Sequence, residues 1–231
     1  MTINARSESF FFYITLLMIA LIFAGFGSAA MFLDQFIYPP SPMLIAHGVI
    51  MLGWYGLTAY QARLIRGSRF KLHKQLGASS VALTLFMLIT GYFVTKGMIV
   101  NPASSIAGLS PAGSTIFPTM DLIGFALFYI LALANRKNAS AHKRLVVLAG
   151  VMMLAPASAR LGLTIGIEPL AGVVAIAFPI IFLIYDWRSL GRLHWASILA
   201  VVVGFGGTAI RMLVGPTQEW QRVAETLYLT T

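Results

Sequence analysis

The chain has 231 residues, of which 58% are hydrophobic and 10% are charged, and its formal net charge is +9. Soluble domains carry about 25% charged residues, so this composition excludes an ordinary soluble surface and indicates an integral membrane protein. The chain has no cysteine, which excludes disulfides, iron–sulfur clusters, thiolate-ligated haem and thiol catalysis.

Seven apolar segments of near membrane-spanning length follow one another along the chain. They lack the alternation of a transmembrane barrel, and a helix needs about 20 residues to cross the bilayer. We therefore predict an all-α, polytopic transmembrane helix bundle: a single domain over 1–231, with one leading helix followed by three helical hairpins. The predicted spans are residues 10–33, 43–65, 74–96, 119–135, 143–165, 169–187 and 195–215.

Local features add detail to this pattern. The first span exceeds the roughly 7–15 residues of a signal-peptide core, so we expect it to be retained. Pro156 and Pro179 lie inside spans, where proline kinks a helix. The long stretch 97–118 is rich in Gly, Ser and Pro and predicts a lid or a re-entrant cover. The tail 216–231 predicts an interfacial helix, with four apolar or aromatic residues near one face: Trp220, Val223, Leu227 and Tyr228.

The basic residues predict the orientation. Twelve of the sixteen Lys and Arg residues fall on one side of the predicted spans: Arg6, Arg63, Arg66, Arg69, Lys71, Lys74, Arg136, Lys137, Lys143, Arg144, Arg188 and Arg192. By the positive-inside rule the N-terminus is cytoplasmic and the C-terminus is outside. The positive charge then matches the lipid bilayer as a partner and not nucleic acid. Asp186 is expected to pair with Arg188 or with a neighbouring basic loop.

Three of the four histidines begin predicted spans directly after basic loops: His73, His142 and His194. One interpretation is that they anchor the helices in the headgroup layer. The other is that two or three of them, His73 with His142 first, bind haem b or a metal ion through neutral imidazole nitrogen. Small and polar residues continue from His73 at helical spacing, which indicates a face turned to the bundle interior: Gly77, Ser80, Thr84 and Gly91.

A second polar set begins near the opposite end of the spans. His47 starts a row at offsets of 4, 7, 11 and 14, which lie on one helix face: Met51, Trp54, Thr58 and Gln61. We expect this face to look into the protein, with Trp54 and Gln61 lining a path inward from His47.

Three charged residues lie at a depth similar to that of His47, within predicted spans: Asp121, Arg160 and Arg211. A charge at mid-span costs about 2.5–3.5 kcal/mol on insertion scales, so such residues pair or line a cavity. Asp121 is expected to pair with Arg160 or Arg211, which leaves one arginine for an anionic or carbonyl-bearing ligand. The alternative for each charge is snorkelling to the interface.

Four segments together resemble a widespread group of bacterial multi-pass membrane proteins whose role is not established: "HGVIMLGWYGLTAYQARLIRGSRFKLHKQLG", "DLIGF", "AHKRLVVLAGVMMLAPASARLG" and "YDWRSLGRLHWAS". The resemblance covers about residues 43–215 and implies a multi-pass protein of the bacterial inner membrane. The chain is more distantly similar to haem-b membrane cytochromes, which share histidines at helix ends, but it lacks their regular paired spacing across two helices.

Three functional hypotheses follow. The first is a ligand- or cofactor-binding protein with a polar site toward the outer face, made by His47, Trp54, Gln61, Asp121, Arg160 and Arg211, for a small anionic or quinone-like ligand. The second is a haem-b or metal-binding redox protein that uses the inner histidines. The third is a non-enzymatic accessory subunit of a larger membrane complex, in which polar residues specify helix packing.

Overall fold

A computed structural model of the chain describes residues 5–32 and 41–229. Over these residues it contains helices and no strand. The predicted end of the first span at residue 33 and the last two residues of the tail lie outside the described residues. The helices are α1 (Ala5–Phe32), α2 (Pro42–Arg66), α3 (Phe70–Ile99), α4 (Pro111–Ser114), α5 (Ile116–Ala134), α6 (Ala139–Met152), α7 (Ala155–Ile165), α8 (Leu170–Leu190), α9 (Trp195–Val214) and α10 (Gln218–Leu229), with a 3₁₀ turn at Pro102–Ser104.

The all-α fold is confirmed over the described residues, and six to seven helical segments are long and apolar enough to span a membrane. By length and composition, six segments of the described chain can cross a membrane: α1, α2, α3, α4 with α5, α8 and α9. Helices α6 and α7 pass the same test together, and they count as a seventh span if the 48° bend between them is a break within one span. Local capping sets where several spans begin, because a side chain satisfies an otherwise unpaired N–H of the first turn. Ser41 caps α2 and Asn138 caps α6 in this way.

The bend between α6 and α7 lies where Pro156 predicts a kink. Helix α6 ends at Met152, and Pro156 falls in the first turn of α7. Proline is tolerated there because the N–H that it lacks would have no partner inside the helix. Pro179 behaves differently, since α8 continues from Leu170 to Leu190 through that residue without interruption.

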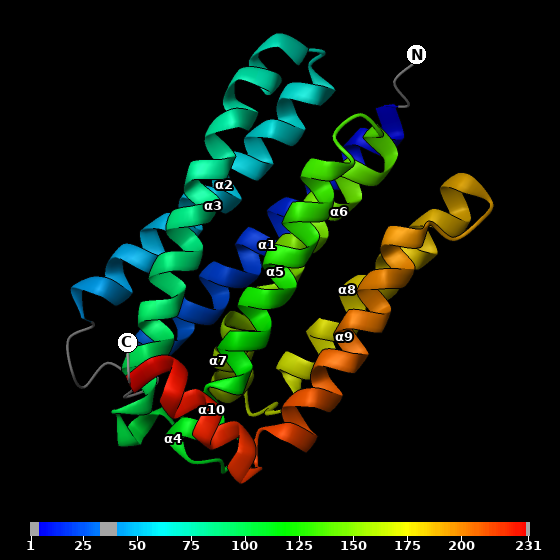
Figure 1. Ribbon diagram of the computed structural model, residues 1–231. Helices are drawn as coiled ribbons and strands as arrows, with labels where there is room; N and C mark the ends of the chain where they lie inside the picture. Colours follow the sequence, from blue (N-terminus) through cyan, green and yellow to red (C-terminus); the bar gives the residue numbers. More distant parts are fainter. Residues whose placement is uncertain (1–4, 33–40, 230–231) are drawn as a thin grey trace.

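The two ends of the bundle differ in character (Figure 1). The start of α1 and the turns α2–α3, α5–α6 and α8–α9 lie at one end, and α4, α10 and the α7–α8 turn lie at the other. We call the first of these the basic end, because it contains the turns 67–69, 135–138 and 191–194 with their basic residues. We call the second the capped end, because α10 crosses it. The arrangement agrees with a leading helix and three hairpins, whereas the cytoplasmic location of the basic end stays a prediction.

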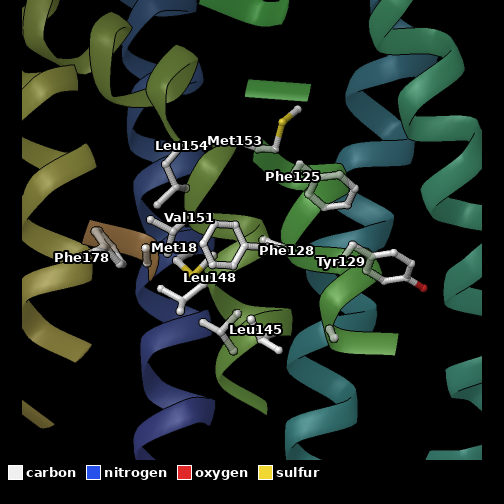
Figure 2. Close-up of a cluster of buried hydrophobic side chains, with 14 of the residues drawn as sticks. Met18, Phe125, Phe128, Tyr129, Leu145, Leu148, Val151, Met153, Leu154 and Phe178 are labelled. Atoms are coloured by element: carbon white, nitrogen blue, oxygen red, sulfur yellow. The ribbon is translucent and has the colours of Figure 1, made fainter. Parts of the chain in front are cut away.

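The core lies where α1, α5, α6 and α8 meet. Figure 2 shows Met18, Phe125, Phe128, Leu148 and Phe178 converging there, and each is buried. Elsewhere many large apolar side chains of the long helices point outward, which is expected when the surrounding solvent is lipid.

Helices α1 and α7 approach each other closely at Gly25. A Cβ atom added at Gly25 would lie 2.0 Å from the carbonyl oxygen of Ala157, so only glycine allows this contact. Small residues commonly permit such backbone approaches between membrane helices.

Helix α10 realises the predicted tail helix, and it packs on the protein. The hydroxyl groups of Tyr228 and Thr119 are 2.8 Å apart, and Tyr92 donates a hydrogen bond of 2.8 Å to the carbonyl oxygen of Leu227. Tyr228 is buried, whereas Val223 and Leu227 are exposed. The stretch 97–118 is shorter as a loop than expected, because α3 extends to Ile99 and α4 begins at Pro111.

Candidate functional site

The six residues predicted for an outer site do not come together as one cluster. Gln61 follows His47 by fourteen residues on α2, which corresponds to about 21 Å along a helix axis. Trp54, halfway between them, is 1% exposed and packs edge-to-face on Phe125 at 5.1 Å. Trp54 is therefore a core residue and does not line an open path.

Asp121 pairs with Arg211, one of its two predicted partners. The carboxylate Oδ1 lies 2.5 Å from the Nη2 atom of Arg211, and this ion pair joins α5 to α9. Asp121 is buried, so the pair offsets the cost of removing both charges from water. Because each charge already has its counter-ion, this pair offers no uncompensated charge to a ligand.

His47 fixes the contact between α2 and α3. Its Nδ1 lies 2.9 Å from the hydroxyl oxygen of Thr90, and Thr90 donates its own hydrogen to the carbonyl of Phe86 at 2.7 Å. Thr90 therefore accepts the bond from His47, and the Nδ1 atom of His47 carries the hydrogen. Neither the Asp121–Arg211 pair nor Arg160 is bonded to this imidazole in the described chain.

Arg160 is the arginine left without a carboxylate. Its Nη1 donates 3.0 Å to the carbonyl of Pro156 on its own helix, and its guanidinium lies 4.7 Å from the centre of the Phe26 ring on α1. Its Nε is buried without a hydrogen-bond partner. Within the described residues no ion pair involves Arg160.

The basic end contains a second polar group, which brings Gln61 together with two of the histidines. His73 interacts electrostatically with His142 and with the backbone of Gln61. The Nδ1 of His142 lies 2.8 Å from the carbonyl oxygen of Ala132. A carbonyl only accepts hydrogen bonds, so this nitrogen carries the hydrogen, and in the neutral ring Nε2 is free to accept one. We call Gln61, His73 and His142 the inner polar site.

Three atoms of the inner polar site are buried without a hydrogen-bond partner among the described residues. They are the side-chain nitrogen and oxygen of Gln61 and the Nδ1 of His73. The Gln61 amide nitrogen would lie 3.9 Å from a Cβ atom at Gly77, one turn along α3 from His73. Deeper on the same face, Ser80 donates to the carbonyl of Gly77 and so accepts a bond of 2.6 Å from the Tyr129 hydroxyl on α5. The hydroxyl groups of Ser80 and Tyr129 are therefore satisfied, whereas the polar atoms of Gln61 and the Nδ1 of His73 are not.

His194 does not join the other two histidines. Its Nδ1 accepts a bond of 3.2 Å from the backbone N–H of Ala196, which caps α9, and its own backbone N–H donates to Asp186. Burial lowers the pKa of His194, and the nearby Arg144 guanidinium lowers the same pKa further. The structure therefore assigns this histidine a capping role.

The ion pair between Arg144 and Asp186 is a buried contact that sequence reasoning identified only in part. Asp186 was expected to pair with Arg188 or a neighbouring basic loop, and its partner is Arg144 on α6, one of the basic residues that predict the orientation. Nε and Nη2 of Arg144 lie 2.8 and 2.6 Å from Oδ1 of Asp186, and the two residues are 2% and 0% exposed. The signal in the sequence was a carboxylate placed between the last two basic turns.

Among residues 5–32 and 41–229, no group of three or more His, Asp or Glu side chains could hold a metal ion. Two concavities of the described surface involve none of the predicted site residues. One lies on α10 around Arg222 and Leu227, and the other lies around Trp187 and Leu193 near the α8–α9 turn.

Comparisons of the chain with models of protein families, with curated proteins and with solved structures find no match.

Proposed function

We propose that this protein is a multi-pass membrane protein that binds a lipid-soluble, quinone-like molecule in the inner polar site. The observation that carries the proposal is the unsatisfied side chain of Gln61, whose two polar atoms are both buried without a partner in the described chain. A buried polar atom without a hydrogen bond costs about 1–3 kcal/mol. Such atoms in native structures point to an additional group that satisfies them.

The donors and acceptors of the site define the ligand. The Gln61 amide offers N–H groups to a carbonyl oxygen, and its oxygen accepts from a hydroxyl. Nδ1 of His73 can donate or accept according to its tautomer, and Nε2 of a neutral His142 accepts. A quinone presents carbonyl acceptors and its quinol presents hydroxyl donors, so this set matches both forms of one molecule.

The surroundings favour a ligand that dissolves in lipid. The site is made by α2, α3 and α6, each of which is or belongs to a span by length and composition. Val81 and Phe86 on α3 point outward from the bundle. A small apolar molecule with a polar head can enter from the bilayer and place only its head among these side chains.

Binding of a short-chain benzoquinone to the purified protein tests this function. Gln61→Leu should weaken binding about 10- to 100-fold, because it removes hydrogen bonds at a desolvated site. Gln75→Leu is the matched control, since Gln75 is an exposed glutamine on α3. Equal affinity of both variants and the unchanged protein would contradict the proposal, and it would indicate that water satisfies Gln61.

An absorption spectrum of the protein purified in mild detergent tests the haem alternative with the same sample. A Soret band that is lost in His73→Leu and His142→Leu would assign the two histidines to haem and would overturn the quinone-like ligand. Co-purification with other membrane subunits, without quinone binding, would favour an accessory role.

We also propose that the basic end faces the cytoplasm of a bacterial inner membrane, on the basis of the basic residues in its turns. The chain has no cysteine, so single cysteines can be introduced without background. Ser68→Cys in the α2–α3 turn should be protected from an impermeant maleimide in intact cells, and Glu219→Cys on α10 should react. The reverse pattern would invert the orientation.

A further inference from the structure

We propose that Arg160, with the ring of Phe26, binds the oxyanion headgroup of a lipid, either a phosphate or a carboxylate, in the half of the membrane at the capped end. This site is separate from the inner polar site and does not depend on the proposed quinone-like ligand. It retains the arginine of the predicted outer site and leaves out Trp54, Gln61 and the Asp121–Arg211 pair.

No carboxylate of the described residues pairs with the charge of Arg160. The described chain contains two arginine–aspartate ion pairs, Arg144 with Asp186 and Arg211 with Asp121. Arg160 lies within the bent span α6–α7 and has no such partner. An ionisable residue inside a membrane span normally pairs or marks a binding site, because burying an uncompensated charge is costly.

The side chain of Arg160 runs back along its own helix. A snorkelling arginine extends toward the nearer interface, which for α7 means the end at Ile165. Instead, Nη1 of Arg160 hydrogen-bonds the carbonyl of Pro156, one turn back toward the bend at Met153 and Leu154. The guanidinium is thus held along the helix, and its position argues against a purely interfacial role.

The guanidinium of Arg160 keeps N–H donors that no described residue uses. A guanidinium has five N–H groups in a planar fork that matches phosphate and carboxylate oxygens. One of these groups is used on Pro156, and Nε is buried with no partner in the described residues. The Phe26 ring 4.7 Å away holds the plane of the cation by a cation–π contact and supplies no counter-charge.

The exposed side chains beside Arg160 indicate that a ligand reaches it from the lipid. Gly25 brings the backbone of α1 against Ala157, so the two helices are in direct contact one turn from Arg160. Phe26 and Leu163 are 40% and 49% exposed. The surface beside Arg160 is therefore apolar and faces lipid, and an oxyanion attached to an acyl chain fits it better than a free, fully hydrated ion.

Native mass spectrometry of the protein with added lipids tests this inference. The unchanged protein should retain phosphatidylglycerol and oleate in preference to phosphatidylcholine and to oleyl alcohol, which lacks the charge. Comparing oleate with phosphatidylglycerol distinguishes the carboxylate from the phosphate source, and inorganic phosphate alone should not bind. Because these arms vary only the ligand, they do not depend on the folding of any variant.

Variants then locate the site. Arg160→Gln should weaken binding of the preferred lipid about 10- to 100-fold, as expected for loss of charge-assisted hydrogen bonds, and Arg160→Lys should retain part of it. Arg222→Gln is the control, since Arg222 is an exposed arginine on α10 at the same end. Equal retention of charged and neutral lipids, or equal loss in the Arg160 and Arg222 variants, would overturn the proposal. Benzoquinone binding should be unchanged in Arg160→Gln, which separates this result from the inner polar site.

Discussion

Removing one partner of the Arg144–Asp186 pair should strongly destabilise the protein. In Asp186→Asn, the guanidinium of Arg144 keeps its bonds of 2.9 Å to the carbonyl and the hydroxyl of Ser140 but loses its counter-ion. In Arg144→Met, the buried carboxylate keeps, among the described residues, the backbone N–H of His194 at 3.2 Å as a donor. Breaking a buried pair in this way costs about 3–5 kcal/mol, since it leaves an uncompensated charge.

The size of the effect follows from this cost. For a chain of this length, each kcal/mol changes the melting temperature by about 2–4 °C, so each single variant should melt about 6–20 °C lower in detergent. The double variant Arg144→Met with Asp186→Leu should recover most of the loss, because an apolar pair replaces a buried ion pair at little cost. Arg188→Met is the control, as Arg188 is exposed on α8.

Differential scanning fluorimetry of the four variants and the unchanged protein measures these values, and retention on a sizing column checks that each protein is monodisperse in detergent. A decrease below about 2 °C for both single variants would refute the reasoning, because it would mean that water or lipid headgroups already solvate the pair.

Three further predictions concern other contacts. Gly25→Ala should lower the free energy of unfolding by about 1–3 kcal/mol through overpacking against Ala157. The control Gly27→Ala should be neutral or stabilising, because a Cβ atom at Gly27 would meet nothing within 4 Å. Equal effects of the two variants in denaturant titrations would contradict the close α1–α7 contact. Burial and the Arg144 guanidinium lower the pKa of His194 in the folded protein. On acidification the unfolded chain therefore binds a proton at a higher pH than the folded chain does. The contribution of His194 to stability is full above the unfolded pKa of about 6.5, and it decreases as the pH falls from that value toward the folded pKa. The variant His194→Asn, which can still cap α9, should therefore show a smaller loss of melting temperature between pH 7.5 and 5.5 than the unchanged protein. Tyr228→Phe removes the hydroxyl bonded to α5, and limited proteolysis should cleave before α10 faster, while unchanged cleavage would show that the hydrophobic contact alone holds this helix.

Several elements of the molecule follow from local chemistry, and they could be predicted from the sequence. Runs of about 20 apolar residues define the spans, since backbone groups in lipid must bond within their own helix. Pro156 marks the bend between α6 and α7 because proline breaks the helix that precedes it. Helical spacing identifies inward faces, and Trp54, Thr58, Thr84 and Gly91 are indeed buried.

The tertiary structure decided which of these faces meet. Asp121 could reach an arginine on either of two helices, and only the packing of α5 beside α9 selects Arg211 and leaves Arg160 alone. Gln61 and His47 share a face of α2, yet a helix rises about 1.5 Å per residue, so Gln61 belongs with His73 at the basic end. A sequence periodicity sets the depth and the face of each residue. The rotation of each helix and the identity of its neighbours depend on contacts between residues far apart in the chain, such as Gly25 with Ala157 and Arg144 with Asp186.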